Sequence, residues 1–189
     1  MLVEEKKVLR NKINAVRNGY QKDWLGEQSR LVSSYLVAWE LFTRAKKVSG
    51  YLAFDSEVNI DGVLQQALAQ GKEVFVPYIS DSDGLMHMTQ LVSFSEIETG
   101  KYGIRTVRNP QIYSCVEDIE LVLTPGLAFT LNGGRMGLGK GYYDRFLAQA
   151  VNAVKIGITL MPQVVGKLPL EAHDIMMDYI VTEKGIISV

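Results

Sequence analysis

Hydrophobic and polar positions follow two different periods along the chain. In the first part, apolar positions return every three or four residues, in the rows Leu9, Ile13, Val16, Tyr20 and Leu31, Tyr35, Ala38, Phe42. This spacing places each row on one face of a helix. The pattern therefore predicts two N-terminal amphipathic helices whose apolar rows face a core.

Short apolar runs of strand composition follow these helices. Residues 48–54 and 73–78 flank a helical pattern that Asn59 can cap and Gly71 ends. A strand, helix and strand of this length suit a parallel crossover. The continuous apolar run 119–129 contains Thr-Pro-Gly, as a buried parallel strand does when it enters a loop.

The rest of the chain completes an α/β pattern. Residues 142–151 have the pattern of a helix, residues 154–160 that of a strand, and residues 179–189 that of a closing hairpin or strand pair. The stretch 85–118 is irregular and predicts weak strands and loop. We predict one domain over residues 1–189, with a mostly parallel central sheet flanked by helices and antiparallel additions.

Composition narrows the classes of partner. The formal net charge is −1 and the sequence pI is about 6.1, so no global basic field would attract nucleic acid or an anionic membrane. One cysteine, Cys115, excludes an internal disulfide, and two separated histidines give no zinc spacing. The charged N-terminus lacks the apolar core of a signal peptide, so we expect cytoplasmic residence.

The segment GGRMGLGKGYYDR, residues 133–145, carries the clearest chemistry. Five glycines in nine residues stand directly before a predicted helix. Glycines can turn successive N–H groups toward one anion, and the helix N-terminus adds further donors. Arg135 and Lys140 supply mobile positive charge. A flexible surface turn is the alternative, but the two cations and paired tyrosines favour an anion site.

This segment is neither of the two common phosphate-binding motifs. A P-loop requires Ser or Thr after its lysine, whereas Gly141 follows Lys140, and eight residues separate Pro125 from Gly134. The dinucleotide pattern G-x-G-x-x-G also fails. A different phosphate cradle would take its metal carboxylate from elsewhere. Asp144 could hold a metal or simply complement the helix dipole, and the sequence leaves both roles open.

Longer stretches of the sequence resemble those of a known family. PGLAFTLNGGRMGLGKGYYDRFL (125–147) closely resembles the signature of the 5-formyltetrahydrofolate cyclo-ligase family. KKVLR (6–10), YLAFDSEVNI (51–60) and EAHDIMMDYIVTE (171–183) resemble its nucleotide-contacting segment, its glutamate-bearing strand end and its C-terminal acidic motif. The resemblance implies a three-layer α/β domain. It also implies ATP- and Mg²⁺-dependent cyclisation of 5-formyltetrahydrofolate to 5,10-methenyltetrahydrofolate through a phosphorylated formyl group, releasing ADP and phosphate.

The resemblance also assigns residues to roles. Arg135 and Lys140 would be catalytic, and ATP would contact Lys6, Arg10, Arg135, Gly137, Gly139, Lys140, Gly141, Tyr142 and Tyr143. The folate would contact Leu52, Glu57, Leu138, Gly139, Lys140, Gly141 and Tyr142. Asp144 and Asp174 would hold Mg²⁺, whose hard-oxygen preference suits carboxylates. We therefore expect Lys140→Ala and Asp144→Ala to reduce turnover sharply and to leave the fold intact.

Several residues near these motifs receive weaker roles. Tyr102 is a further candidate for stacking on the folate, and His173 could orient Asp174. We interpret Arg17 as a surface residue, His87 as structural and Cys115 as inert.

Two positions depart from the family pattern. Thr130 stands where many members carry an acid, which weakens the case for a metal or loop-ordering role there. Met136 replaces a more usual leucine, a volume-conserving change that should have little effect.

Two other classes of function remain as alternatives. One is a non-catalytic folate- or nucleotide-binding module, and the other is a sugar-phosphate isomerase or CoA transferase of similar architecture. Lys140, Asp144 and Asp174 together argue against the first, and the KKVLR segment argues against the isomerase. We expect a small-molecule substrate, no nucleic-acid or membrane partner, and a monomer or weak homo-oligomer.

Overall fold

The protein is represented by a computed structural model that describes residues 2–80, 84–100, 103–171 and 174–189. Its α-helices are α1 (Leu2–Asn18), α2 (Lys22–Ala38), α3 (Glu40–Arg44), α4 (Asp61–Ala69) and α5 (Tyr142–Gln149), and its 3₁₀ turns include η1 (Phe94–Glu96), η3 (Val116–Asp118) and η4 (Met161–Gln163). Its strands are β1 (Lys47–Ser49), β2 (Glu73–Ile79), β3 (Met86–Leu91), β4 (Ile97–Thr99), β5 (Arg105–Val107), β6 (Leu121–Pro125), β7 (Ala128–Phe129), β8 (Arg135–Met136), β9 (Val154–Ile158), β10 (Tyr179–Thr182) and β11 (Gly185–Ser188).

A seven-stranded sheet in the order β11-β10-β9-β6-β1-β2-β3 forms the centre of the molecule. Its five inner strands are parallel, while β3 and β11 pair antiparallel at the two edges. Two short antiparallel pairs, β4 with β5 and β7 with β8, lie outside this sheet. The predicted parallel core with antiparallel additions is confirmed.

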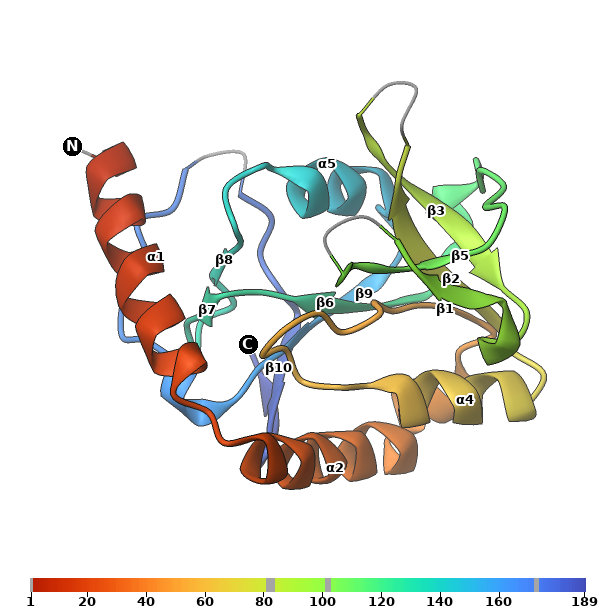
Figure 1. The fold of residues 1–189 in the computed structure, drawn as a ribbon, viewed down its shortest axis with the longest axis horizontal. Coiled ribbons are helices and arrows are strands. Elements are labelled where there is room, and N and C mark those ends of the chain that lie inside the picture. The colour runs from red at the N-terminus through yellow and green to blue at the C-terminus, as the bar shows by residue number, and fades with distance from the viewer. Residues whose placement is uncertain (1, 81–83, 101–102, 172–173) are drawn as a thin grey trace.

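Helices cover both faces of the sheet, which gives three layers (Figure 1). On β6, Leu121 and Leu123 pack in the core beneath α2 and α4, whereas Val122 packs in the core beneath α5. Because both faces are covered, the inner strands are apolar at nearly every position. This explains the continuous apolar run in the sequence.

Helix α1 belongs to neither covering layer and lies beside the β7–β8 pair (Figure 1). Ile13 is buried in a third apolar cluster with Leu127, Met136 and Leu168. The predicted inward row of α1 is therefore confirmed. Its position brings the N-terminal helix against the segment that leads into the glycine run.

The predicted inward row of the second helix is wrong at Leu31, Tyr35 and Ala38, which are exposed, and correct at Phe42, which is buried in the core. Leu31 and Tyr35 are 41% and 37% exposed, whereas Val32 and Leu36 are fully buried. Two features explain why the sequence pattern gave the wrong row for this helix. Ser29, a polar residue, occupies the buried face and accepts a hydrogen bond from the Asn59 N–H, and the helix ends before Phe42 at the extended Trp39.

The first strand is shorter than the predicted run 48–54, because β1 ends at Ser49. Gly50 follows, and a Cβ there would lie 2.6 Å from Leu64 Cδ2 of α4. The chain then leaves the sheet, so the residues after Gly50 become a loop at the strand's carboxyl end.

None of the helices in the described ranges has the length and apolar composition that a membrane crossing requires.

Candidate active site

The order of the strands creates a crevice between β1 and β6. From β1 the chain passes through α4 to β2 on one side, and from β6 it passes through α5 to β9 on the other. In open α/β sheets, ligands bind where the direction of winding reverses, outside the carboxyl ends of the strands. We call this side of the sheet the carboxyl edge, and the opposite side the amino edge.

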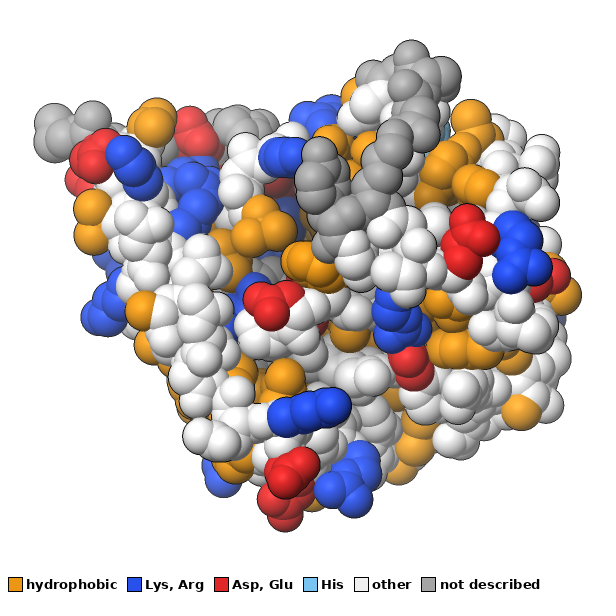
Figure 2. Space-filling view, viewed as in Figure 1, with side chains coloured by type: hydrophobic (Ala, Val, Ile, Leu, Met, Phe, Trp, Pro, Cys, Tyr) orange, Lys and Arg blue, Asp and Glu red, His pale blue; other side chains and the backbone are white. Residues whose placement is uncertain are grey.

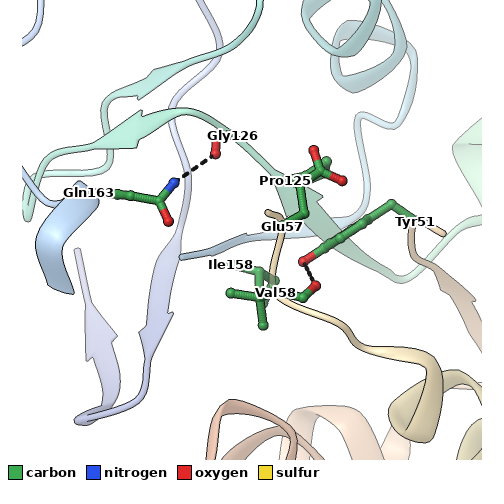
Figure 3. Close-up of a pocket in the computed structure, with 7 residues that line it drawn as sticks. All are labelled: Tyr51, Glu57, Val58, Pro125, Gly126, Ile158 and Gln163. Carbon is green, nitrogen blue, oxygen red and sulfur yellow. Dashed lines mark hydrogen bonds between the residues drawn. The ribbon is translucent and has the colours of Figure 1, made fainter. Parts of the chain in front are cut away.

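A pocket lies in this crevice, as Figure 3 shows. Its lining residues follow the ends of the parallel strands and are Tyr51, Glu57, Val58, Pro125, Gly126, Ile158 and Gln163. The Tyr51 hydroxyl donates to the Val58 carbonyl oxygen at 2.8 Å, and Gln163 Nε2 donates to the Gly126 and Leu127 carbonyl oxygens at 3.3 and 2.9 Å. The pocket walls are therefore fixed by hydrogen bonds.

Glu57 is carried by a tight turn, residues 54–57. The Glu57 N–H donates to the Phe54 carbonyl oxygen at 3.2 Å, and the Phe54 N–H donates to Glu57 Oε2 at 3.0 Å. Burial raises the pKa of the Glu57 carboxyl above its ordinary value, while the Phe54 N–H and the positive charge of Arg17 oppose this shift. The predicted folate-binding carboxylate is thus partly desolvated and lines the crevice.

Arg17 was interpreted as a surface residue, and the structure contradicts this. Its side chain lies in the last turn of α1, is 6% exposed, and donates from Nε to Ser56 Oγ at 3.2 Å. The sequence did contain a signal, because Arg17 is seven residues after Arg10 beside the inward row of α1. The sequence alone does not reveal that this face of α1 packs against the turn at residues 54–57.

The segment before the glycine run is ordered by Thr130. Its Oγ1 accepts the Gly134 N–H at 2.9 Å and bonds the side chain of Asn132. A Cβ at Gly134 would stand 2.6 Å from the same oxygen, so glycine is required for this contact. Thr130 therefore has the loop-ordering role that the missing acid made doubtful.

Residues 137–141, called here the glycine segment, lead directly into α5. Gly139 and Gly141 have φ values of +100° and +67°, which residues with a Cβ rarely adopt. Gly141 is the N-cap of α5 and provides no side-chain cap. Backbone N–H groups at the start of α5 are therefore available to an anion, as the sequence predicted.

The two cations of this region differ in mobility. Arg135 is 5% exposed, and its Nη2 lies 2.6 Å from Asp144 Oδ1 in an ion pair. The prediction of mobile charge is wrong for Arg135, because its side chain is buried and is held by Asp144 and by the Pro125 carbonyl oxygen. Lys140 is exposed, with its Nζ 6.0 Å from the Tyr142 ring centroid, and it can reach a ligand.

Helix α1 contributes two cations to the same region. Arg10 Nε donates to the Gly137 carbonyl oxygen at 3.1 Å, and a Cβ on Gly139 would lie 3.0 Å from Arg10 Cζ. Lys6 Nζ lies 2.6 Å from Glu171 Oε2 and 3.1 Å from Asp174 Oδ2. Lys and Arg side chains gather between α1 and α5 in the view of Figure 2.

These acids also set the charge of Lys6. Desolvation lowers the pKa of Lys6, but the hydrogen bonds and charges of Glu171 and Asp174 outweigh it, so that the pKa is raised. Lys6 therefore stays charged at neutral pH. Helix α1, the glycine segment and the C-terminal acidic motif, all distant in sequence, form one polar region.

The predicted magnesium ligands both have a cationic partner in the protein. Asp144 pairs with Arg135, and Asp174 pairs with Lys6. The described residues contain no group of three or more His, Cys, Asp or Glu side chains that could hold a metal ion. Mg²⁺ is often held by one or two carboxylates together with phosphate oxygens and water. A Mg²⁺ ion at either aspartate would therefore take its remaining ligands from phosphate oxygens and water.

Tyr143 lies on α5 beside Arg135, whose Cζ is 5.6 Å from the centroid of the Tyr143 ring. Its hydroxyl oxygen is buried and has no hydrogen-bond partner among the described residues. Burial raises the pKa of Tyr143, the negative charge of Glu57 raises it further, and the positive charge of Arg135 lowers it. The Tyr143 hydroxyl is therefore neutral at physiological pH.

Three other residues that the sequence predicts to contact a ligand do not line the pocket. They are Leu138, Tyr142 and Leu52. Leu138 is 69% exposed on the glycine segment, and the Tyr142 hydroxyl donates to the Gly84 carbonyl oxygen at 3.3 Å. Leu52 is buried in the main core and is not among the residues that line the pocket.

His87 and Cys115 are not among the residues that line the pocket. His87 lies on β3 with its ring 5.8 Å from the Tyr78 ring, and Cys115 is an exposed free thiol. Tyr102 and His173 lie outside the described residues.

The fold is that of a doubly wound α/β protein, with a polar pocket at the carboxyl edge and a glycine segment that leads into α5. The sequence profile of the 5-formyltetrahydrofolate cyclo-ligase family matches residues 2–183, and the chain belongs to this family.

Individual relatives agree with this membership. The chain is 30% identical to the Caenorhabditis elegans protein named probable 5-formyltetrahydrofolate cyclo-ligase, with 95% of this chain and 93% of that protein covered. The structure resembles the Aquifex aeolicus 5,10-methenyltetrahydrofolate synthetase with a TM-score of 0.84 at 31% identity, covering 97% of this chain and 92% of the other. The Mycoplasma pneumoniae 5,10-methenyltetrahydrofolate synthetase shares the fold, with a TM-score of 0.76 at 21% identity over 95% of this chain and 99% of the other.

Proposed function

We propose that the protein cyclises 5-formyltetrahydrofolate to 5,10-methenyltetrahydrofolate with consumption of ATP and release of ADP and phosphate. Family membership and the names of the similar proteins support this activity. The structural observation that carries the proposal is the position of Arg135. Its Nη1 donates to the carbonyl oxygen of Pro125, a residue that lines the pocket, at 3.5 Å, and its Nη2 pairs with Asp144 of α5 at 2.6 Å, so the polar pocket and the start of α5 are adjacent.

The reaction needs activation because a formyl amide resists attack at its carbon. In the proposed sequence, the formyl oxygen forms a bond to the γ-phosphorus of ATP as the bond to ADP breaks. N10 of the folate then bonds to the formyl carbon, loses its proton, and displaces phosphate together with the former formyl oxygen. The protein must therefore align the formyl oxygen with the γ-phosphate and stabilise charge on the transferred group.

The residues of the crevice suit these tasks. The exposed Lys140 ammonium and the N–H groups of the glycine segment would bind the phosphates. Arg135 would fix the start of α5, which follows this segment, through its ion pair with Asp144. The Glu57 carboxylate would accept N–H hydrogen bonds from the pterin end of the folate. Arg10 and Lys6 would orient the nucleotide from α1.

Magnesium would be held by Asp144 and Asp174 together with phosphate oxygens. The ion would supply positive charge to the transferred group when bound.

An assay with the purified protein tests the proposal. The protein is incubated with 5-formyltetrahydrofolate, ATP and Mg²⁺, and methenyl absorbance and ADP are followed together. We expect one ADP for each methenyl product and no product when ATP is left out. Binding of both compounds without turnover would identify a non-catalytic module instead, and product without ADP would exclude the phosphorylated intermediate.

We further propose that the protein acts in the cytoplasm as a monomer or weak homo-oligomer. Its net charge of −1 gives no general attraction to nucleic acid or anionic membrane.

A further inference from the structure

Arg17 is a buried cation that the proposed reaction does not use. No ion pair within 4 Å joins it to a carboxylate in the described part of the chain, and its Nε bonds a neutral hydroxyl, Ser56 Oγ, at 3.2 Å. Arginine keeps its charge in proteins, and burying a charge without a paired partner is unfavourable. A buried guanidinium in this state calls for a function.

The turn that Arg17 contacts is conformationally unusual. Asp55 has a φ of +54°, a left-handed conformation that is uncommon for a residue other than glycine. Ser56 Oγ, the acceptor for Arg17, in turn donates to Asp55 Oδ2 at 3.3 Å. The Ser56 hydroxyl thus links the arginine of α1 to Asp55, the strained position, which lies two residues before Glu57. Such strain persists where the surroundings hold it, and it gathers at functional sites.

We propose that Arg17 is a positioning residue for the Glu57 carboxylate. Through Ser56 it fixes the turn that presents Glu57 to the crevice, and its guanidinium supplies the positive charge that a partly desolvated carboxylate needs there. The identity of the ligand, a reduced folate, rests on the proposed function, whereas the coupling of Arg17 to Glu57 does not.

The charged and titratable groups around Glu57 support this role. Arg17 faces it from α1, Asp55 from the turn itself, Tyr51 from the segment after β1, and Tyr143 from α5. Burial and Asp55 raise the pKa of Glu57, and Arg17 lowers it. Loss of Arg17 therefore shifts Glu57 toward its protonated form, which cannot serve as a full acceptor for N–H donors.

The first test needs no enzymatic activity. The carboxyl carbon of Glu57 is followed by NMR as a function of pH in the wild type, Arg17→Met and Arg17→Lys. We expect the Glu57 pKa to rise by about one unit in Arg17→Met, the lower end of the effect of an opposite charge at close range, and to stay near the wild-type value in Arg17→Lys. Arg44→Met, which removes a 77% exposed guanidinium of α3, serves as the control for charge alone.

A second test separates positioning from general damage. In Arg17→Met, we expect KM for 5-formyltetrahydrofolate to rise at all pH values, because the bond to Ser56 is lost. The rise should be about tenfold larger at the acidic end of the pH profile than at the alkaline end, the factor that corresponds to one pKa unit. KM for ATP should change less than about twofold, because the phosphate side of the crevice is untouched. Ser56→Ala should raise the folate KM at all pH values while leaving the pKa of Glu57 unchanged.

The outcomes distinguish the two proposals. A Glu57 pKa that is unchanged in Arg17→Met overturns the role of Arg17 even if the wild type is an active cyclo-ligase. A wild type without activity overturns the proposed function, while the NMR result still decides the coupling. If Arg17→Met does not fold, a wild-type folate KM in Ser56→Ala would overturn the positioning role.

Discussion

The two edges of the parallel sheet differ in whether their buried polar groups have hydrogen-bond partners. At the amino edge, Lys72 Nζ donates to the Thr43 and Ala45 carbonyl oxygens at 2.8 and 2.6 Å, and the Lys46 N–H donates to Glu120 Oε2 at 2.9 Å. At the carboxyl edge, by contrast, buried polar atoms remain without partners in the described residues. These atoms are Tyr20 Oη, Thr124 Oγ1, Arg135 Nε, Tyr143 Oη and Thr159 Oγ1.

This difference separates stability from function. Buried polar atoms in native proteins are nearly always hydrogen-bonded, so a group of exceptions needs an explanation. At the amino edge the polar groups close off strand ends and hold the fold together. At the carboxyl edge, Thr124 and Thr159 directly adjoin Pro125 and Ile158, two residues that line the pocket. Substitutions at the two edges should therefore affect different properties.

The largest effect on activity is expected for Lys140→Ala. This substitution removes an exposed ammonium with no ion pair to a described residue, so the melting temperature should not change. Loss of one cation that stabilises the transferring phosphoryl group should lower kcat/KM by about 10³-fold. Lys184→Ala, at the exposed turn between β10 and β11, is the matched control. A kcat/KM within twofold of the wild type would mean that Lys140 has no role in phosphoryl transfer.

Asp144→Asn should reduce kcat/KM by about 10²-fold, an effect the size of losing a good transition-state contact. Unlike the expectation from sequence alone, it should also destabilise the fold by about 2 kcal/mol, because the buried Arg135 loses its carboxylate. Urea denaturation and steady-state kinetics measure the two quantities. Unchanged stability would show that the Arg135–Asp144 ion pair does not form in solution.

Glu57→Gln should raise KM for 5-formyltetrahydrofolate by about tenfold, since a carboxamide accepts N–H hydrogen bonds more weakly than a carboxylate. Its stability should change in the opposite direction to its activity. Burial raises the pKa of Glu57 in the folded state, so the stability contributed by this group is highest below the unfolded-state pKa and is lost as pH rises through the folded-state pKa.

The Glu57→Gln variant lacks this loss. Its free energy of unfolding relative to the wild type should increase as pH rises through that window, and at neutral pH it should be the more stable protein. Urea titrations between about pH 4 and pH 8 bracket the ordinary carboxyl range and test this. A variant that becomes relatively less stable with rising pH would contradict the desolvation of Glu57.

The smallest effect on activity is expected at the amino edge. Lys72→Met should lower the free energy of unfolding by about 1 kcal/mol, because two hydrogen bonds to carbonyl oxygens are lost. Its kcat/KM should stay within about twofold of the wild type. A large loss of activity without a loss of stability would remove the distinction between the two edges.

Local sequence patterns predicted the sheet and most helices because their signals are short-range. The apolar run that contains β6, the Gly71 stop of α4, and the closing β10–β11 pair were all found in this way. The predicted Asn59 cap is wrong, because the N-cap of α4 is Ile60, although Asn59 Oδ1 accepts the Asp61 N–H at 2.8 Å. The inward row of α2 was not, since Ser29 and the break at Trp39 depend on contacts with other elements.

The candidate site was predictable in part for the same reason. The glycine segment carries its own signal, because glycines before a helix have few other purposes. The burial of Arg135 carries none, and the only signal for Arg17 is its position beside the inward row of α1, because both depend on how α1 and the β7–β8 pair pack against the crevice. The family resemblance indicated which residues to examine, but not that Asp144 and Asp174 each pair with a cation.

The central claim is that one crevice at the carboxyl edge holds the triphosphate and the folate side by side. A crystal structure with a non-hydrolysable ATP analogue and 5-formyltetrahydrofolate tests it most directly. We predict the terminal phosphate within hydrogen-bonding distance of the glycine segment and Lys140, with the pterin against Glu57. A terminal phosphate bound elsewhere on the molecule, or a folate outside the crevice, would contradict the account.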